Sequence, residues 1–494
     1  MSAAADDLAT LVAGARRAAR TMASLDASAR ETALVGLVDH LESSRAVIEA
    51  ANKMDKEAAA KASLAAPLLK RLDVEGAKFD GMLRKVDEVR ALADPVGVVQ
   101  RATELDAGLE LYRVSCPIGV LCVIFESRPE AAVQISALAL KSANAVILKG
   151  GKEAAHTNAA LVAAMQGALS AGGVIPPEAI SLVASRDEVA ALLRLHGEID
   201  LIVPRGSNAL VSSIMANTSI PVLGHADGVC AVYLDRAANV ETAVAVAVDA
   251  KTDYPVACNA AETILVHRDA LATAWPAVAA ALLSKGVVIL ADDETRSAAG
   301  ALGAVVGGGA GGGAIVAAAA ADFRTEFGAL RVAAKAVGSV DEAVDHINGH
   351  GSHHTDAIVT EDDAAADAFV RRVDSAGVYV NASTRFADGN RYGFGAEVGV
   401  STNRVHSRGP MGVEGLLIFK YLLYGGGHTA AQFSSGERVF THRPLPLRLP
   451  AGRGAAGAAA RAWLRWLGGR RAAELVVAAA VGVGVGWIVA RVRR

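Results

Sequence analysis

The chain has few cysteines and few aromatic residues. Only four of its 494 residues are cysteine, at irregular spacing and without a CxxC pair. This excludes a disulfide framework and a zinc finger, and it favours a reducing compartment. No HExxH pattern occurs, and the histidines at 350, 353 and 354 stand beside two glycines, as in a polar loop. No metal site is therefore expected.

Other sequence signals are also missing. Residues 298–321 are nearly all alanine and glycine, and because no Gly-Lys-Ser/Thr follows, they predict a flexible surface loop rather than a phosphate loop. The acidic residues Asp6 and Asp7 do not fit the N-terminal composition of a signal peptide or a transit peptide. The net charge is −3, yet residues 451–494 carry eight arginines and one acid, so the remaining chain is acidic. An acidic body argues against nucleic-acid binding.

The periodicity of the sequence predicts an α/β fold. The first ninety residues are typical of helices, and Asp26 or Ser28 can cap the helix that contains Leu34, Leu37 and Leu41. Apolar strands then alternate with helices, which is the pattern of a doubly wound parallel sheet. A second α/β unit follows Cys258. The strands expected first are 118–125, 145–148, 180–183, 201–203 and 229–234, with helices at 129–141 and 154–170.

Cys258 stands at the start of an apolar run. It follows a Tyr-Pro turn at residues 254–255 and precedes the strand-like run 263–267. A thiol at the mouth of a strand can be partly exposed, and a thiolate can attack an acyl carbon. Most free cysteines, however, are small buried hydrophobes, so this position alone does not establish a nucleophile.

Six segments carry a family resemblance, and they occur in the same order. Together they resemble the glutamate-5-semialdehyde dehydrogenases (γ-glutamyl phosphate reductases) over residues 8–430. They are equally similar to the second half of the pyrroline-5-carboxylate synthetases, whose kinase half is missing here. The resemblance implies the aldehyde dehydrogenase fold, with two doubly wound α/β domains and a small oligomerisation arm. The segments are 125–130, 148–154, 204–208, 253–263, 344–358 and 381–410.

The resemblance implies reduction of L-glutamyl 5-phosphate to L-glutamate 5-semialdehyde with release of phosphate, a step of proline synthesis. Cys258 would attack the acyl phosphate, and the resulting thioester would be reduced by NADPH. Backbone N–H groups around Cys258 and Asn259 are expected to stabilise the oxyanion. The superfamily also uses an asparagine side chain, whose place Ser127 takes here.

A second departure from the superfamily favours a reductase. Hydrolytic aldehyde dehydrogenases place a glutamate base ahead of the strand that here begins near Val229. The corresponding stretch, 223–228, has no glutamate, and Asp227 is its only carboxylate. An enzyme that exchanges its thioester with phosphate needs no such base. The alternatives left open are another acyl-CoA or aldehyde dehydrogenase of the superfamily, and a membrane-tethered paralogue without catalysis.

The resemblance also implies an NADP(H) site. Lys149 ends the strand 145–148, where ligands meet open α/β sheets, and the matching lysine contacts the adenosine ribose. NAD-preferring relatives have a glutamate where this chain has Lys152, and a cation there attracts a 2′-phosphate. Ser207, with Arg205 and Gly206, matches the pyrophosphate region, and Glu326 matches the glutamate near the nicotinamide ribose.

The substrate carries a phosphate and an α-carboxylate, which need cationic partners. The candidates are Arg128, Arg385, Arg391, Arg404 and Arg408. The further partners expected are a second copy of the chain, in a homo-oligomer, and a separate glutamate 5-kinase. The predicted domains are 1–235 (helices and NADP-binding domain), 236–410 (catalytic domain), 411–445 (oligomerisation arm) and 446–494 (basic linker and hydrophobic tail).

The tail lies beyond the family resemblance. Residues 475–490 contain no charge and three glycines, and five arginines flank them. A membrane helix usually needs about 20 apolar residues, with about 17 as the lower bound, so sixteen is marginal. Two interpretations stay open. The tail is either an anchor, in a membrane such as the mitochondrial outer membrane with the enzyme in the cytoplasm, or an Ala/Gly-rich extension.

Overall fold

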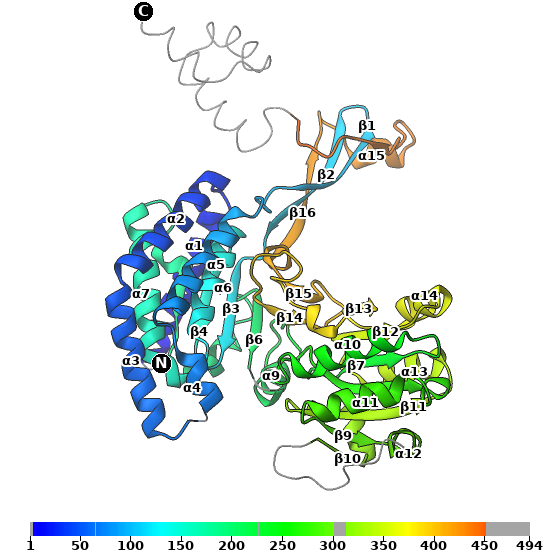
Figure 1. Cartoon of the computed structure of the whole chain (residues 1–494). Coiled ribbons are helices and arrows are strands. Elements are labelled where there is room, and N and C mark those ends of the chain that lie inside the picture. Colours follow the sequence, from blue (N-terminus) through cyan, green and yellow to red (C-terminus); the bar gives the residue numbers. More distant parts are fainter. Residues whose placement is uncertain (1–2, 65, 207, 226, 301–312, 451–494) are drawn as a thin grey trace, which may run out of the picture. The chain divides into compact units, whose positions relative to one another are not determined.

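The computed structural model describes residues 3–64, 66–206, 208–225, 227–300 and 313–450. The chain forms two compact units (Figure 1). Of these described residues, the first unit contains those within 1–95 and 117–417, and the second contains those within 96–116 and 418–450.

The first unit begins with helices whose buried residues recur at helical spacing. Asp26 is the cap of the second helix, because its carboxylate accepts the N–H of Ala29 at 2.9 Å. Leu34, Leu37 and Leu41 lie on the buried side of the same helix. The helices are α1 (Ala3–Met22), α2 (Ala27–Ser43), α3 (Arg45–Lys61), α4 (Ala66–Leu72) and α5 (Ala77–Ala91).

A parallel sheet with strand order β5-β4-β3-β6 follows these helices. The chain runs outward from β3 to β5 and then returns to place β6 beside β3. The carboxyl ends of β3 and β6 therefore flank the point where the winding direction reverses, which is where open α/β sheets bind ligands. The elements are β3 (Val120–Phe125), α6 (Glu130–Lys141), β4 (Ala145–Lys149), α7 (Ala155–Gly172), β5 (Ile180–Leu182), α8 (Arg186–Leu192), β6 (Leu201–Arg205) and α9 (Asn208–Ala216).

A second parallel sheet has the order β10-β9-β11-β8-β7-β12-β13. Its strands alternate with helices along the chain, so each parallel connection is a helical crossover. The elements are β7 (Cys230–Leu234), α10 (Val240–Thr252), β8 (Ala261–His267), α11 (Ala274–Ser284), β9 (Val288–Ala291), α12 (Asp293–Gly300), β10 (Ala314–Ala317), β11 (Arg331–Val337), α13 (Val340–His350), β12 (Thr355–Val359), α14 (Asp363–Arg372) and β13 (Gly377–Val380).

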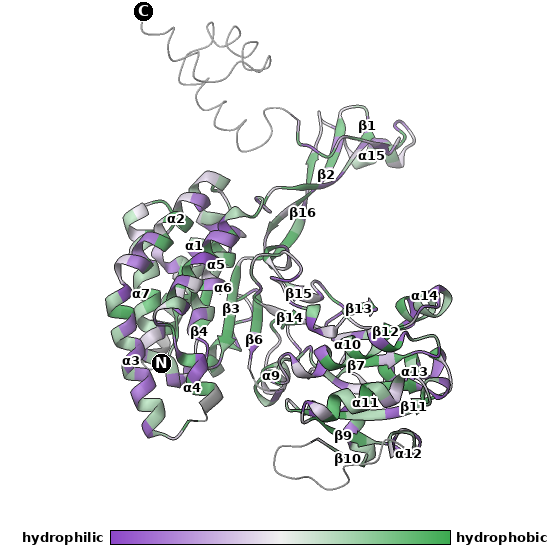
Figure 2. Cartoon of the chain, in the orientation of Figure 1, coloured by the Kyte–Doolittle hydropathy of each residue, from purple (hydrophilic) through white to green (hydrophobic). Residues whose placement is uncertain are grey.

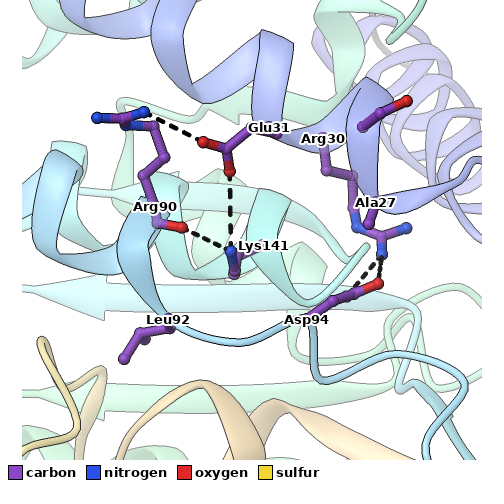
Figure 3. Close-up of a pocket in the computed structure, with 8 residues that line it drawn as sticks. Ala27, Arg30, Glu31, Arg90, Leu92, Asp94 and Lys141 are labelled. Carbon is purple, nitrogen blue, oxygen red and sulfur yellow. Dashed lines mark hydrogen bonds and ion pairs between the residues drawn. The ribbon is translucent and has the colours of Figure 1, made fainter. Parts of the chain in front are cut away.

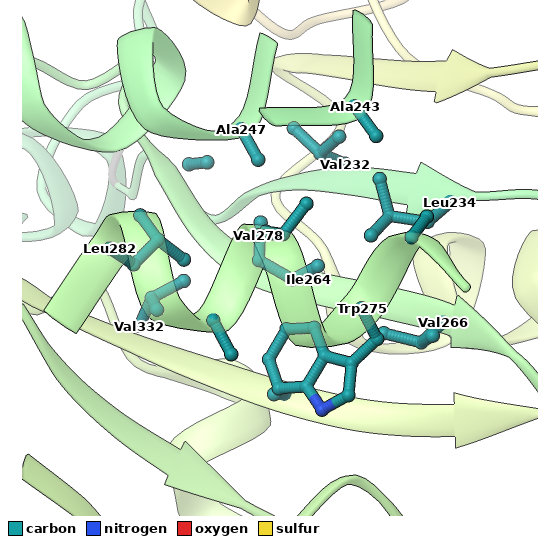
Figure 4. Packing of buried hydrophobic residues seen from close by; sticks show 14 of the residues in the cluster. Val232, Leu234, Ala243, Ala247, Ile264, Val266, Trp275, Val278, Leu282 and Val332 are labelled. Carbon is teal, nitrogen blue, oxygen red and sulfur yellow. The ribbon is translucent and has the colours of Figure 1, made fainter. Parts of the chain in front are cut away.

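Neighbouring residues of one strand join different cores, which shows that helices cover both faces of this second sheet. Val232 and Leu234 pack with Trp275 and other residues of α10 and α11 (Figure 4). Tyr233, between them on β7, packs with Phe369 of α14 in the other core. This alternation is the period of two expected of a strand buried on both faces. The doubly wound α/β fold predicted from the sequence is confirmed, and the first predicted strands and helices are found within two residues of their expected ends.

The second unit is an antiparallel sheet of order β16-β2-β1-β17. Tyr112 and Tyr424 meet edge to face in its small core. The outer strand β16 exposes Phe419, Tyr421 and Leu423, and Figure 2 marks its hydrophobic stretches. The elements are β1 (Val99–Asp106), β2 (Leu109–Pro117), β16 (Leu417–Tyr424), α15 (Ala430–Ser434) and β17 (Arg443–Pro444), whereas the small hairpin β14 (Gly399–Ser401) and β15 (Gly409–Met411) belongs to the first unit.

Two sequence predictions, the Ala/Gly-rich loop and the C-terminal tail, are not confirmed in full by the structure. The loop predicted over 298–321 is wrong at residues 314–317, which form β10 and pair with β9. It is also wrong at residues 298–300, which end α12, and at 320–321, which begin a short 3-10 helix. The tail 451–494, with the segment 475–490, lies outside the described residues. Among the helices that are described, none combines the length and apolar character of a membrane span.

Candidate active site

Four adjacent strands of the second sheet bring together residues from distant parts of the sequence. These strands, β11, β8, β7 and β12, are neighbours in the sheet. Cys258 comes three residues before β8, Gly228 two residues before β7, and His354 directly before β12. Glu326 precedes β11. Because the strands are parallel, all these residues lie at the amino edge of the second sheet.

Cys258 lies in a turn and is partly exposed, unlike Cys122 on β3 and Cys230 on β7, which are buried. Its carbonyl oxygen accepts a hydrogen bond from the Cys230 thiol at 3.3 Å. Burial raises the pKa of Cys230 well above its usual value, and burial raises the pKa of Cys122 to about 12. Those two thiols stay protonated at neutral pH, so they serve packing rather than nucleophilic attack.

Gly228 holds the backbone of β7 against the Cys258 turn. A Cβ atom at position 228 would lie 2.1 Å from the carbonyl oxygen of Cys258. No side chain can be added there without moving the turn. The N–H of Gly228 donates to the Glu326 carboxylate at 3.0 Å. Glu326, assigned by resemblance to the nicotinamide ribose, therefore lies next to the cysteine turn.

Asn259 is buried and fastens the cysteine turn to residues 384–387. Its side-chain NH₂ group donates to the backbone carbonyl of Ala387 at 2.8 Å. Its backbone carbonyl accepts from the Thr384 hydroxyl at 2.6 Å. Its side-chain oxygen accepts from the Arg385 guanidinium. The side chain of Asn259 is thus engaged within the protein, and only its backbone N–H can face a reacting carbonyl.

Two of the candidate arginines converge on Asp253. Arg385 donates to the Asp253 carboxylate at 3.1 Å and Arg391 at 3.2 Å. The hydrogen bond from Arg391, and then that from Arg385, hold the pKa of Asp253 below its usual value. Both arginines therefore brace the segment that leads to Cys258.

Two further candidates converge on Asp374. Arg408 donates to the Asp374 carboxylate and to its carbonyl, both at 3.0 Å. Arg404 also pairs with this carboxylate. One acid thus already compensates part of their charge.

Arg128 differs from these four arginines. It follows β3 at the switch point, its side chain is accessible, and no carboxylate of the described residues lies within ion-pair distance. Desolvation, and then the positive charges of Arg205 and Arg71, lower the pKa of Arg128. Arg71, on α4, donates to the Tyr254 hydroxyl at 3.1 Å, four residues before Cys258. The nearby Glu130 carboxylate offsets only part of this effect. Cations that form no ion pair with a described carboxylate are suited to hold an anion.

Ser127 adopts a left-handed backbone, with φ of 46°, after β3. Its N–H and its hydroxyl both donate to one oxygen of Glu153, each at 2.7 Å. Desolvation opposes ionisation of Glu153, but these hydrogen bonds prevail and lower its pKa. The Ser127 hydroxyl is therefore turned toward a carboxylate in this structure.

Four of the predicted cofactor residues end or follow strands at the carboxyl edge of the first sheet, whereas Glu326 lies at the amino edge of the second sheet. Lys149 ends β4, and Lys152 is exposed three residues later with no partner among the described residues. Arg205 ends β6 and lies 3.7 Å from Glu397, followed by exposed Gly206. Ser207 lies outside the described residues.

Sequence reasoning missed three residues near Cys258. One nitrogen of His225, one of His354 and the Cys258 sulfur lie within 4.8 Å of one another. Tyr254 was named only as part of a turn, yet it binds Arg71. The only available signal for the histidines was topological, because both precede strands adjacent to β8. Asp227, by contrast, is exposed and accepts a hydrogen bond from Asn208.

A separate hollow of about 320 Å³ lies among α2, α5 and α6 (Figure 3). Its charges are already paired within the protein. Arg30 binds Asp94 at 2.7 Å, and Arg90 binds Glu31 at 3.2 Å. Lys141 donates to the Arg90 carbonyl at 2.8 Å. These ion pairs and hydrogen bonds hold the helices together. None of the candidate site residues lines this hollow.

The chain is similar to proteins of known family. The model of the aldehyde dehydrogenase family matches residues 1–302. Gamma-glutamyl phosphate reductase 1 of Synechocystis sp. is 48% identical over 437 residues, which cover 88% of this chain and 98% of that protein. Gamma-glutamyl phosphate reductase of Nostoc sp. is 47% identical over 87% of this chain and 96% of its own length.

Solved structures agree with these matches. The crystal structure of gamma-glutamyl phosphate reductase from Thermotoga maritima superposes with a TM-score of 0.81 at 35% identity, covering 85% of this chain and 99% of that one. An acetylating aldehyde dehydrogenase from Geobacillus thermoglucosidasius, 18% identical with a TM-score of 0.62 over 86% of this chain and 97% of that one, shares the fold. The chain therefore belongs to the gamma-glutamyl phosphate reductases, within the aldehyde dehydrogenase family.

Proposed function

We propose that the protein reduces L-glutamyl 5-phosphate to L-glutamate 5-semialdehyde with NADPH and releases phosphate. The observation that carries the proposal is the partly exposed Cys258 at the amino edge of the second sheet, beside Gly228 and Glu326. Its family membership supports the substrate, because the relatives are named as reductases of this compound.

The chemistry follows from the Cys258 thiolate. The sulfur attacks the acyl carbon, an S–C bond forms, and the C–O bond to phosphate breaks, leaving a thioester. NADPH, when bound, supplies the hydride that reduces this carbonyl carbon. The thiohemiacetal then collapses, so that the semialdehyde leaves and the sulfur returns to its starting state.

The negative charge that develops on the acyl oxygen during thiolate attack needs hydrogen-bond donors. The backbone N–H groups of Cys258 and Asn259 donate to no acceptor among the described residues, whereas those of Ala257 and Ala260 bond to carbonyls of the turn. We assign the first two as oxyanion donors. Ser127 can add its hydroxyl only by leaving Glu153.

The carboxyl edge of the first sheet fits NADP(H). Exposed Lys152 has no ionic partner in the described part of the chain, so its ammonium is available for a 2′-phosphate. Lys149 at the end of β4, Arg205 with Gly206 after β6, and Glu326 would hold the remaining parts of the cofactor.

A direct assay tests the function. Purified protein supplied with the semialdehyde should reduce NADP⁺ only when inorganic phosphate is present. Dependence on coenzyme A instead of phosphate would identify an acyl-CoA reductase of the same fold. Phosphate-independent formation of the carboxylic acid would indicate a hydrolytic aldehyde dehydrogenase, and no turnover with any of these would reject the enzyme.

Replacing Lys152 with glutamate should shift cofactor preference toward NADH. The substitution reverses the charge that would meet the 2′-phosphate, and we expect the ratio of kcat/KM for NADPH over NADH to fall about tenfold to a hundredfold, or roughly 1–3 kcal/mol. Steady-state kinetics with both cofactors measure it. Exposed Lys53→Glu, on α3, is the control, and an unchanged ratio for Lys152→Glu would refute this role.

Arg128 is the best-placed residue for a substrate anion. Arg128→Ala should lower kcat/KM for glutamyl phosphate about tenfold to a hundredfold, because one charge-assisted hydrogen bond is lost. KM for NADPH should stay the same. Arg371→Ala, which removes an exposed arginine paired with Asp367 on α14, provides the control. Equal kinetics for the two variants would exclude Arg128 from the substrate site.

We further propose a homo-oligomer formed through β16, whose exposed Phe419, Tyr421 and Leu423 suit a subunit contact. The enzyme would act in the cytoplasm and receive its unstable acyl phosphate from a separate glutamate 5-kinase.

Membrane contact through residues 475–490 rests on the sequence alone. Full-length protein should sediment with membranes after a carbonate wash, whereas a chain that ends at Pro450 should stay in the supernatant. Both should have similar activity, because every proposed catalytic residue precedes Pro410. Equal fractionation of the two proteins would reject the anchor.

A further inference from the structure

The amino edge of the second sheet carries a cluster of soft metal ligands. His225, Cys258 and His354 each offer one ligand atom, and the three atoms lie within 4.8 Å of one another. The segments that hold them precede β7, β8 and β12, which are adjacent strands. Neighbouring parallel strands therefore bring the three residues to one place.

His354 supplies an independent sign of a missing partner. Its side chain is fully buried, and its Nε2 atom makes no hydrogen bond. The other ring nitrogen, Nδ1, lies 3.0 Å from the Thr355 hydroxyl. A buried polar atom without a partner is rare in folded proteins and calls for an unseen water or ion. His225 packs edge to face on His354, with ring centres 5.0 Å apart.

His225 is held in the tautomer that a metal ion requires. Its Nδ1 lies 3.0 Å from the carbonyl oxygen of Val400. Because a carbonyl can only accept, a neutral His225 carries its proton on Nδ1 and keeps a lone pair on Nε2. Metal-binding histidines usually donate their second ring N–H to such a carbonyl or carboxylate.

We propose that Cys258, His225 and His354 bind Zn²⁺ and that the ion reversibly inhibits the enzyme. One thiolate and two imidazoles form a ligand set that suits zinc, with a fourth position left for water. Zinc–ligand bonds of about 2.0–2.3 Å would separate the ligand atoms by roughly 3.3–3.6 Å. The three side chains must therefore draw together slightly, and Cys258, in a turn and partly exposed, can rotate to do so.

The bonding change is simple. The S–H bond of Cys258 breaks, its proton passes to solvent, and a Zn–S bond forms without any change of oxidation state. The sulfur can then no longer attack an acyl carbon. The inhibition rests on the proposed function, whereas zinc binding does not. The sequence predicted no metal site, because no metal-ligand spacing joins residues 225, 258 and 354 along the chain.

Isothermal titration of Zn²⁺ into the full-length, metal-free protein tests the site. We expect one tight ion per chain, with affinity reduced at least about tenfold in His225→Gln and in His354→Gln, and lost in Cys258→Ser. His196→Gln, which removes an exposed histidine, and Cys116→Ser should bind zinc like the unaltered protein. Equal zinc affinity in all variants would overturn the proposal, as would loss in Cys258→Ser alone.

Cobalt provides a second measurement that needs no variant of buried His354. Co²⁺ bound at this site should give a thiolate-to-cobalt charge-transfer band and the intense visible bands of tetrahedral coordination. Absence of the charge-transfer band at saturating Co²⁺ would overturn the proposal. A protein that binds zinc here but reduces no glutamyl phosphate would refute only the proposed function. An active reductase that zinc neither binds at this site nor inhibits would refute only the zinc site.

Discussion

Cys258→Ser is expected to fold normally and to lose turnover by at least about a thousandfold. A serine hydroxyl has nearly the size of a thiol but is a far weaker nucleophile at neutral pH, so the thioester cannot form. The fold should tolerate the change because the side chain is partly exposed in a turn. The phosphate-dependent assay measures turnover, and circular dichroism with thermal melting measures folding.

Cys116→Ser is the matched control. Cys116 is also partly exposed, but it lies on β2 in the other unit, and burial raises its pKa. This variant should keep full activity. Iodoacetamide should inactivate the unaltered enzyme and Cys116→Ser at similar rates, and glutamyl phosphate should protect both. More than a few per cent activity in a well-folded Cys258→Ser protein would remove Cys258 as the nucleophile.

Local patterns predicted the parallel sheets well because their strands are buried on both faces. β3, β4 and β7 are short apolar runs followed by helices of clear period, so each can be recognised within a few residues. The sheet of the second unit was harder to predict. β16 joins β2 in one sheet although about 300 residues separate them, and no local pattern records which strands pair.

The candidate site could be proposed from the sequence where a single residue stands out, but not where several distant residues must come together. Cys258 stands out within its motif, whereas His225 and His354 become neighbours only through the order of β8, β7 and β12. The arginines show the same limit. Sequence placed Arg385 and Arg408 in one group, and only the structure shows that Asp253 pairs with the first and Asp374 with the second.

The alanine and glycine content produced a specific error. Residues 298–321 have the composition of a loop, yet 314–317 pair with β9 as the outer strand β10. Ile315 and Val316 of this strand are β-branched residues that favour strands. The alanines and glycines around them hid this short signal.

A buried ion pair flanks the candidate nucleophile Cys258 in the sequence. Lys251, near the end of α10, and Glu262, on β8, are both fully buried, and their charged groups are 2.6 Å apart. Glu262 also accepts the N–H of Gly328 at 3.3 Å. Burial raises the pKa of Glu262 to about 7, against the opposing effect of Lys251, and burial lowers the pKa of Lys251. Each group depends on the other to stay charged inside the protein.

Lys251→Met should therefore destabilise the protein by about 3–5 kcal/mol at pH 9, because it leaves the Glu262 carboxylate buried without a cation. The loss should be smaller at pH 6. A carboxyl group whose folded pKa lies above its unfolded value of 4.5 binds its proton more tightly in the folded state. Stability then falls as pH rises through the folded pKa. Urea unfolding at both pH values measures the difference.

Two comparisons isolate the buried charge as the cause. The double variant Lys251→Met, Glu262→Leu should recover most of the lost stability and lose the added pH dependence, since no charge remains. Lys56→Met breaks a 3.0 Å pair with Asp73 that is about one-third exposed, and should cost less than about 1 kcal/mol. If Lys251→Met lost no more stability than Lys56→Met at pH 9, Glu262 would not depend on Lys251. If its loss were the same at pH 6 and pH 9, the cost would come from packing, because an apolar contact has no reason to change with pH across this range.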